Sequence, residues 1–188
     1  MTTEKKLNLG CGADIRAGYV NLDIVAMPGV DVVHDLKVLP YPFKDDEFDE
    51  IFASHCLEHL PNFVDALEEL WRITKHGGKF NIHVPYFASE LAFRDPTHVI
   101  FFTYKTFTNW IIREEYATHL GKKMRFKVVK RKISFFGGNP KRWWGKIANI
   151  ISIPLSLPVN AFPVIYERFF CFIYPCTNIY YQLEVIKK

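Results

Sequence analysis

Acidic residues are missing from one long stretch of this chain. Between Tyr116 and Tyr166 there is no Asp or Glu, whereas ten Lys or Arg residues lie in that interval. These cations are Lys122, Lys123, Arg125, Lys127, Lys130, Arg131, Lys132, Lys141, Arg142 and Lys146. Such an imbalance attracts anions, which include phosphates, acidic sugars, RNA and anionic membrane surfaces. The alternative is an ordinary solvated face of a strand.

Cysteines are few and form no motif. The four are Cys11, Cys56, Cys171 and Cys176, without a C-x-x-C pair. This spacing excludes a disulfide scaffold or a structural zinc site and favours reduced thiols. Residues 1–6 also lack an apolar run of signal-peptide length, so nothing marks the chain for export. We therefore expect a cytoplasmic protein.

Charge of either sign is absent from residues 147–166, and yet Pro154, Pro158 and Pro163 interrupt this apolar stretch. Three prolines disfavour a membrane-spanning helix. We expect residues 137–177 to form a hydrophobic helical lid or insert that packs on the core. The alternative is a peripheral membrane contact through Trp143 and Trp144, because Trp beside cations suits a layer of lipid head groups.

A chain of 188 residues, 49% of them hydrophobic, is most simply one domain spanning 1–188. Apolar runs predict strands at 7–9, 19–24, 30–33, 48–54, 79–84, 122–136 and 178–185. The apolar stripe after Asn62, a candidate N-cap, predicts a helix that stops at Gly77-Gly78, and a second amphipathic helix is expected over 103–117. The first two crossovers are too short for full helices. The pattern indicates an α/β sheet with an antiparallel pair at one end.

The segment Leu7 to Asp14 (LNLGCGAD) and the later Asn21-Leu22-Asp23 carry the most functional information. Gly10 and Gly12 allow a sharp turn that brings the backbone close to a ligand. Asp23 ends the next strand, where a carboxylate can accept both hydroxyls of a ribose. This arrangement predicts a nucleotide-cofactor site.

Further motifs follow: His34-Asp35-Leu36, Leu39 to Phe43 (LPYPF), Phe48-Asp49 and Ser54 to His59 (SHCLEH). Together with the glycine segment they resemble the class I S-adenosylmethionine-dependent methyltransferases, in the subgroup that includes quinone-biosynthesis methyltransferases. The resemblance covers residues 7–85. It implies a Rossmann-like, mostly parallel seven-stranded sheet with a final antiparallel strand, trimmed N-terminal helices and a helical insert before the last strand.

The resemblance also implies a cofactor, S-adenosylmethionine, with S-adenosylhomocysteine as product. The loop of Gly10, Cys11 and Gly12 would run alongside the methionine and ribose parts of the cofactor. Asp23, followed by Ile24, would bind the ribose hydroxyls. The expected adenine contacts are Asp35 and Leu36, and the expected contacts beyond the fourth strand are Ser54 and His55.

Two departures from the family bear on the alternatives. Asp14 replaces a glycine that the family loop often has, and the helix after that loop shrinks to residues 14–18. A pyrophosphate-binding dinucleotide enzyme needs that helix start, so this alternative is disfavoured. The sequence His55-x-x-Glu58-His59 also matches an inverted zinc-peptidase motif, but that motif belongs inside a helix, whereas here a strand precedes it and Pro61 follows. We expect no metal.

The acceptor side is expected between His83 and His98, after the fifth strand, with Tyr86, Arg94 and His98 as substrate contacts. His98 is the candidate catalytic base and His55 the second candidate, because imidazole titrates in the useful range. The alternative is that His98 is structural.

The expected function is methyl transfer to a small or membrane-proximal acceptor, such as an anionic saccharide or lipid-linked intermediate. Two alternatives stay open: an RNA methyltransferase that uses the basic region 122–146, and a non-catalytic scaffold that binds a partner or a membrane.

Overall fold

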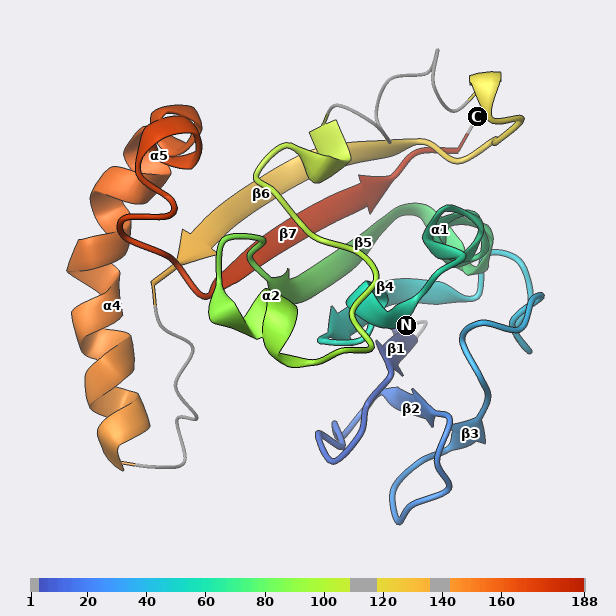
Figure 1. The fold of residues 1–188 in the computed structure, drawn as a ribbon. Coiled ribbons are helices and arrows are strands. Elements are labelled where there is room, and N and C mark those ends of the chain that lie inside the picture. Colours follow the sequence, from blue (N-terminus) through green and yellow to red (C-terminus); the bar gives the residue numbers. More distant parts are fainter. Residues whose placement is uncertain (1–3, 109–117, 136–142, 188) are drawn as a thin grey trace.

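A single seven-stranded sheet organises the chain (Figure 1). The computed structural model describes residues 4–108, 118–135 and 143–187. The strand order is β3-β2-β1-β4-β5-β7-β6. The strands are β1 (Lys6–Leu9), β2 (Val20–Asp23), β3 (Val32–Val33), β4 (Phe48–Ser54), β5 (Thr74–Pro85), β6 (Phe126–Ser134) and β7 (Asn178–Val185).

Strands β1 to β5 pair in parallel, and β7 pairs antiparallel with both β5 and β6. This arrangement confirms the predicted fold class, including the antiparallel pair at one end. The bounds of β4 and β7 are as predicted, whereas β6 is shorter than the expected 122–136.

The crossovers from β1 to β2 and from β2 to β3 contain no helix, as expected from their length. The sheet therefore has one well-covered face and one open face. Strand β7 shows this by alternation: Ile179, Tyr181 and Leu183 are fully buried, whereas Tyr180 and Gln182 between them are partly exposed. The open face provides one wall of a polar hollow described below.

Helix α1 (Phe63–Ile73) buries its apolar stripe against the covered face. The predicted stop at Gly77-Gly78 is wrong, because α1 ends at Ile73 and both glycines lie within β5. Thr74 adopts an extended conformation there, and its hydroxyl donates to the Leu70 carbonyl at 2.6 Å. Asn62 is at the N-cap position, but its side chain makes no capping hydrogen bond and donates instead to the Lys37 carbonyl.

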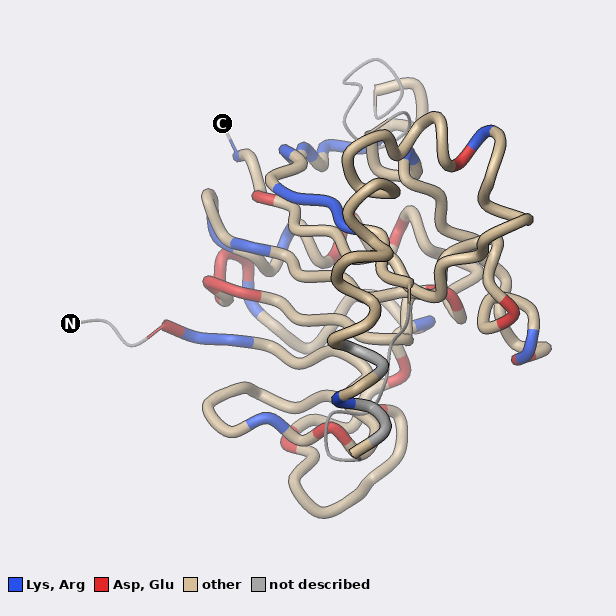
Figure 2. Tube along the Cα trace, turned by 90° about the vertical axis from the view of Figure 1, so that its left-hand side faces the viewer, with Lys and Arg blue, Asp and Glu red and all other residues tan. Residues whose placement is uncertain are grey.

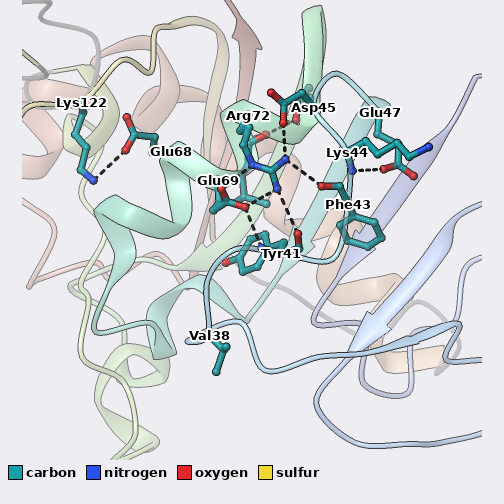
Figure 3. Close-up of polar contacts among 12 residues, drawn as sticks. Val38, Tyr41, Phe43, Lys44, Asp45, Glu47, Glu68, Glu69, Arg72 and Lys122 are labelled. Atoms are coloured by element: carbon teal, nitrogen blue, oxygen red, sulfur yellow. Dashed lines mark hydrogen bonds and ion pairs between the residues drawn. The ribbon is translucent and has the colours of Figure 1, made fainter.

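Arg72 fastens the loop between β3 and β4 to α1 (Figure 3). Its guanidinium forms a bidentate ion pair with Glu69, in which both hydrogen bonds are 2.7 Å long. It also donates to the carbonyls of Tyr41 and Phe43 and to the Asp45 carboxylate. Bidentate pairs of this kind are among the stronger polar contacts. They fix the loop that carries the expected adenine contacts.

The expected helix over 103–117 is described only in part. Residues 104–108 form a turn and the start of a helical segment, in which Phe107 is fully buried. Residues 109–117 lie outside the described part of the chain. Upstream, the short helix α2 (Glu90–Arg94) begins after Ser89, whose hydroxyl accepts from the Leu91 N–H.

The expected helical insert is present as α4 (Trp143–Ala161) and α5 (Pro163–Phe169). Figure 1 shows both helices beyond the ends of β6 and β7, at one side of the sheet. In the described residues no single helix has the length and apolarity to span a membrane. Only the pair Ile150–Ala161 and Pro163–Phe169, bent by 94°, reaches that composition together.

Helix α4 packs on the sheet with its polar side. Ser152, Ser156 and Val159 are buried at helical spacing. The Phe135 N–H donates to Ser156 Oγ, and Asn160 exchanges two hydrogen bonds of 2.8 Å with the backbone of Ile133 in β6. Most of the large apolar side chains described in α4 consequently face outward.

Candidate functional site

The glycine loop follows β1 and turns through left-handed backbone. Gly10 has φ +59° and Gly12 has φ +48°, conformations that side chains disfavour. Gly10 also has no room for a Cβ, which would lie 2.6 Å from Cys56 Cβ. Cys11 is buried between them, and its N–H donates to the Leu22 carbonyl. The loop is thereby held against the ends of β2 and β4.

Asp23 ends β2 directly beside this loop. Its Oδ2 accepts the Gly12 N–H at 2.7 Å, and its Oδ1 accepts the Val25 N–H at 3.0 Å. Ile24 next to it is exposed and apolar. A fixed carboxylate with remaining lone pairs, flanked by apolar surface, fits a ribose diol and the ring attached to it.

Asp35 and Leu36 lie in the loop after β3. The Asp35 carboxylate accepts the Lys37 N–H at 2.9 Å, and the Leu36 carbonyl accepts the Tyr41 hydroxyl. The backbone of this loop joins the Asp23 region, because the His34 N–H donates to the Asp23 carbonyl. The structure thus brings the expected ribose and adenine contacts together at the carboxyl ends of β1, β2 and β3.

A hollow of about 690 Å³ lies beyond the carboxyl ends of β4 and β5. Ser54 ends β4, and His55 follows with a positive φ of 53°, its N–H donating to the His83 carbonyl. The lining residues are His55, Glu58, His59, Pro85, Leu91, Arg94, Asp95, Pro96, His98 and Asn178. Ligands of open α/β sheets bind at this edge.

Three of the expected acceptor-side residues line this hollow, and Tyr86 does not. His55, Arg94 and His98 do so, whereas Tyr86 is fully buried and its hydroxyl donates to Glu167 of α5 at 3.2 Å. Burial raises the pKa of Tyr86 well above its usual range. The expectation of a substrate contact at Tyr86 is therefore corrected: it ties the end of β5 to the insert.

Sequence reasoning missed Glu58 and Asn178 as lining residues. Glu58 is 1% exposed, and neither of its carboxylate oxygens has a hydrogen-bond partner; Asn178 Oδ1 is likewise unpaired. Glu58 was considered only as part of the His55-x-x-Glu58-His59 motif, because its burial depends on the distant Val99 and Ile100, whose N–H groups donate to the Glu58 carbonyl.

Comparison with known families decides the type of domain. Residues 7–82, from β1 into β5, match the methyltransferase domain family. This match relates the part of the chain from β1 into β5 to known methyltransferase domains. A methyltransferase match supports S-adenosylmethionine as the cofactor, as the resemblance implied, whereas the quinone-biosynthesis subgroup stays a prediction.

Solved methyltransferases share the fold across the described chain. A putative methyltransferase from Bacillus halodurans is 16% identical, with 100% of this chain and 94% of that chain covered and a TM-score of 0.54. An S-adenosylmethionine-dependent methyltransferase from Archaeoglobus fulgidus is 16% identical, with 97% and 86% covered and a TM-score of 0.53. At such identity the likeness concerns the fold alone.

Two other similarities involve enzymes whose acceptors are known. A Haemonchus contortus phosphoethanolamine N-methyltransferase is 16% identical, with 100% of this chain and 50% of that chain covered and a TM-score of 0.54. A sterol 4-C-methyltransferase from Caenorhabditis elegans is 38% identical over 42 residues, 22% of this chain. The chain spans only 13% of the length of this curated relative.

The open face of the methyltransferase sheet holds a second hollow, of about 470 Å³. His83 projects into it from β5 between the rings of Phe52 and Tyr180, with ring centroids 5.4 and 4.7 Å away. Burial, with the nearby His55 and Arg16, lowers the pKa of His83 to about 4. His83 is therefore neutral in the folded domain at physiological pH.

We expect this depressed pKa to make the fold sensitive to mild acid. The unfolded chain binds a proton at His83 below about pH 6.5, whereas the folded chain resists protonation down to about pH 4. Stability is thus lost as pH falls across that window. His83→Gln should reduce the loss by about 1–2 kcal/mol, allowing for partial exposure. Urea denaturation of the wild type and of His83→Gln from pH 4 to 8 measures the free energy of unfolding. The same dependence of that free energy on pH in both proteins would contradict the prediction.

Proposed function

We propose that this methyltransferase acts on a lipid or lipid-linked anionic acceptor, as a cytoplasmic protein held peripherally on a membrane. The observation that carries the proposal is the outward face of the insert. Of the 24 large apolar side chains that are exposed in the described residues, 14 lie between Trp143 and Tyr174. A patch of this extent on one side of a domain indicates an interaction surface.

The orientation of α4 supports a lipid surface as the partner. Ile150, Ile153 and Leu157 share one helix face and are all more than half exposed. Trp143 at the start of α4 is 75% exposed, while the side chain of Trp144 lies outside the described part of the chain. Figure 2, with α4 on the near side, shows the described part of this helix in the colour of uncharged residues, apart from one blue segment.

Between α4 and α5 is an apolar hollow of about 450 Å³, large enough for part of a hydrocarbon chain. Its lining residues are Leu155, Pro158, Val159, Phe162, Ile165, Tyr166, Phe170 and Tyr174. Lys146 of α4 and Arg168 of α5 are exposed cations on the same two helices. Cations near an apolar face favour an anionic lipid layer.

The insert is joined to the acceptor side of the domain. Glu167 of α5 accepts from the Tyr86 hydroxyl and from the Tyr104 N–H, and Phe172 packs edge-on against Phe87 at 5.7 Å between centroids. Tyr86 directly follows Pro85, which lines the 690 Å³ hollow. A lipid contact at the insert would thus place this hollow close to the membrane surface.

The chemistry requires alignment and, for a hydroxyl acceptor, a proton acceptor. S-adenosylmethionine supplies a methyl group whose bond to sulfur breaks, with the electron pair going to sulfur, as the acceptor atom bonds to carbon. His98 Nδ1 lies 3.0 Å from the Ala92 carbonyl, which can only accept, so Nδ1 carries the proton and Nε2 keeps its lone pair. His98 Nε2 is therefore the proposed proton acceptor, with the more exposed His55 second.

RNA is a weaker candidate acceptor because two cations of the basic segment have structural roles. Lys122 pairs with Asp65 and Glu68 of α1. Arg131 lies 4.1 Å above the Tyr104 ring and donates to the Tyr104 carbonyl. RNA methylation and the non-catalytic scaffold are accordingly outcomes that the test must distinguish.

The test combines vesicle binding with transfer of a radiolabelled methyl group. We expect the full chain to sediment with phosphatidylglycerol vesicles and to label a lipid extract of membranes. Replacing Ile150, Ile153 and Leu157 together by Ser should remove most vesicle binding and lipid labelling without changing S-adenosylmethionine affinity. The control Val33→Ser alters an exposed residue of β3 and should bind vesicles normally.

Two results would contradict the proposal. Label that enters RNA or a water-soluble acceptor, with none in the lipid extract, would exclude a lipid acceptor. Unchanged vesicle binding by the triple variant would exclude the outward face of α4 as the docking surface. Vesicle binding without any S-adenosylmethionine binding would favour the scaffold.

A further inference from the structure

The buried carboxylate of Glu58 has no hydrogen-bond partner in the acceptor hollow. Its side chain is 1% exposed, and neither oxygen accepts a hydrogen bond. The nearest cationic candidates are His55 Nδ1 at 3.4 Å and His98 Nε2 at 3.9 Å from Oε1, the second beyond hydrogen-bond distance. Burying a carboxylate without compensation costs several kcal/mol. A cation at this position would remove that cost.

Two imidazoles lie close to the Glu58 carboxylate, and in the neutral form each keeps a lone pair on Nε2. His98 donates from Nδ1 to the Ala92 carbonyl, which leaves Nε2 as an acceptor. His59 Nδ1 lies 2.8 Å from Thr97 Oγ1, and the Thr97 hydroxyl donates in turn to Asp95. Because the Thr97 proton goes to Asp95, His59 Nδ1 must donate and His59 Nε2 keeps its lone pair.

This arrangement is the one that metal-binding histidines use. Such a histidine donates its second ring N–H to a carbonyl or a carboxylate, which fixes the tautomer and the ring orientation. Here Ala92 does this for His98, and the Thr97–Asp95 chain does it for His59. The two rings lie 4.6 Å apart between centroids.

The three ligand atoms also lie close enough for one ion. One atom from each of Glu58, His59 and His98 falls within 4.8 Å of the other two. Tetrahedral ligand atoms about 2.0–2.2 Å from zinc are some 3–4 Å apart, so a small contraction would complete the site. Two imidazoles and a carboxylate suit zinc and similar transition metals better than calcium or magnesium.

We propose that Glu58, His59 and His98 bind a divalent transition-metal ion, with an open coordination position facing the acceptor hollow. This proposal rests on the proposed methyl transfer and specifies its acceptor: a group with a hydroxyl or phosphate oxygen that can bind the ion. A hydroxyl bound there releases its proton to water more readily. His98 then acts as a metal ligand and not as the proton acceptor; the ion would lower the pKa of the bound hydroxyl, whose proton goes to water.

The site differs from the peptidase motif excluded above. That motif would use His55 and His59 from one helix, whereas here residues 57–59 form only a short 3₁₀ helix. The second histidine ligand is His98, which comes from beyond α2. The pairing of distant segments explains why spacing along the sequence did not predict a metal.

The test is metal binding by the full chain after removal of metals with a chelator. We expect one equivalent of Co²⁺ to give the visible absorption of a protein-bound ion, and Zn²⁺ to displace it. Glu58→Gln and His98→Asn should each weaken binding about 100-fold or more, and Thr97→Val about 10-fold. The matched controls Glu68→Gln and His76→Asn alter side chains outside the hollow and should bind normally.

Thermal unfolding separates a metal site from a structural role. Zn²⁺ should raise the Tm of the wild type and of both controls but not that of Glu58→Gln. Without metal, Glu58→Gln should unfold no earlier than the wild type, because it removes an unpaired buried charge. Absence of stoichiometric binding to the wild type, or equal binding by Glu58→Gln, would overturn the metal site. S-adenosylmethionine titrations report separately on the proposed methyl transfer.

Discussion

Replacing Asp23 by alanine is expected to weaken S-adenosylmethionine binding by about 100-fold or more. The carboxylate would hydrogen-bond the ribose hydroxyls, and hydrogen bonds to a charged group contribute about 1.5–3 kcal/mol each. Asp23 also holds the glycine loop through the Gly12 N–H. The substitution therefore removes ligand contacts and loosens the loop that shapes the site. Calorimetric titration with S-adenosylmethionine and S-adenosylhomocysteine measures the loss.

The matched control is Asp14→Ala in the same loop. Asp14 is exposed, and its carboxylate pairs with Arg16 rather than with the loop backbone. We expect its effect on affinity to stay below about threefold, in line with a surface ion pair worth under 1 kcal/mol. Equal losses in the two variants would show that the loop responds to charge in general and that Asp23 is no specific ligand.

Gly10→Ala is expected to destabilise the domain by about 2–5 kcal/mol. A side chain at φ +59° costs about 1–2 kcal/mol. The added Cβ would also meet Cys56 Cβ at 2.6 Å and Cys56 Sγ at 3.2 Å, and overpacking of this kind adds about 1–3 kcal/mol. Because Cys56 is buried and donates to the Leu9 carbonyl, it has little freedom to move away.

Gly12→Ala separates the two causes. Its φ is also positive, at +48°, but a Cβ there meets no atom within 4 Å. We expect a loss of only about 1–2 kcal/mol from backbone strain. Urea denaturation of the three proteins measures the difference. If both alanine variants lose the same stability, the close approach of Gly10 to Cys56 does not restrict this position.

The local pattern of apolar and polar residues predicted those strands whose structural surroundings match that pattern. In strand β7 buried apolar residues alternate with partly exposed residues along the whole length, so its limits could be predicted from the sequence. Strand β4 could be predicted because turn residues precede and follow it. The start of β5 did not follow, because two glycines after an amphipathic helix are typical of a helix stop. Here Gly78 is needed in the strand: a Cβ would lie 2.6 Å from Thr74 Cγ2 and 2.9 Å from the Lys75 carbonyl oxygen.

The proximity of the donor-side candidates was predictable because they are close in sequence. Gly10, Gly12 and Asp23 lie within 14 residues, in the loop after β1 and at the end of the neighbouring strand β2. The acceptor side depends on contacts between residues 55–59 and 92–100, which no local pattern encodes. For this reason Glu58 was not assigned to the acceptor side and Tyr86 was misassigned.

The hydrogen bonds between α4 and β6 restrict how the helix can turn about its own axis. Asn160 and Ser156 pair with backbone groups at Ile133 and Phe135, which would otherwise lie unpaired at the border of the sheet. A rotation that hid the isoleucines of α4 would break these bonds. The exposed apolar face of α4 is thus a consequence of the hydrogen bonds that pair its opposite face with the edge strand β6. It follows that polar substitutions on this exposed face of α4 should leave the fold intact and change only which surfaces or partners the protein binds.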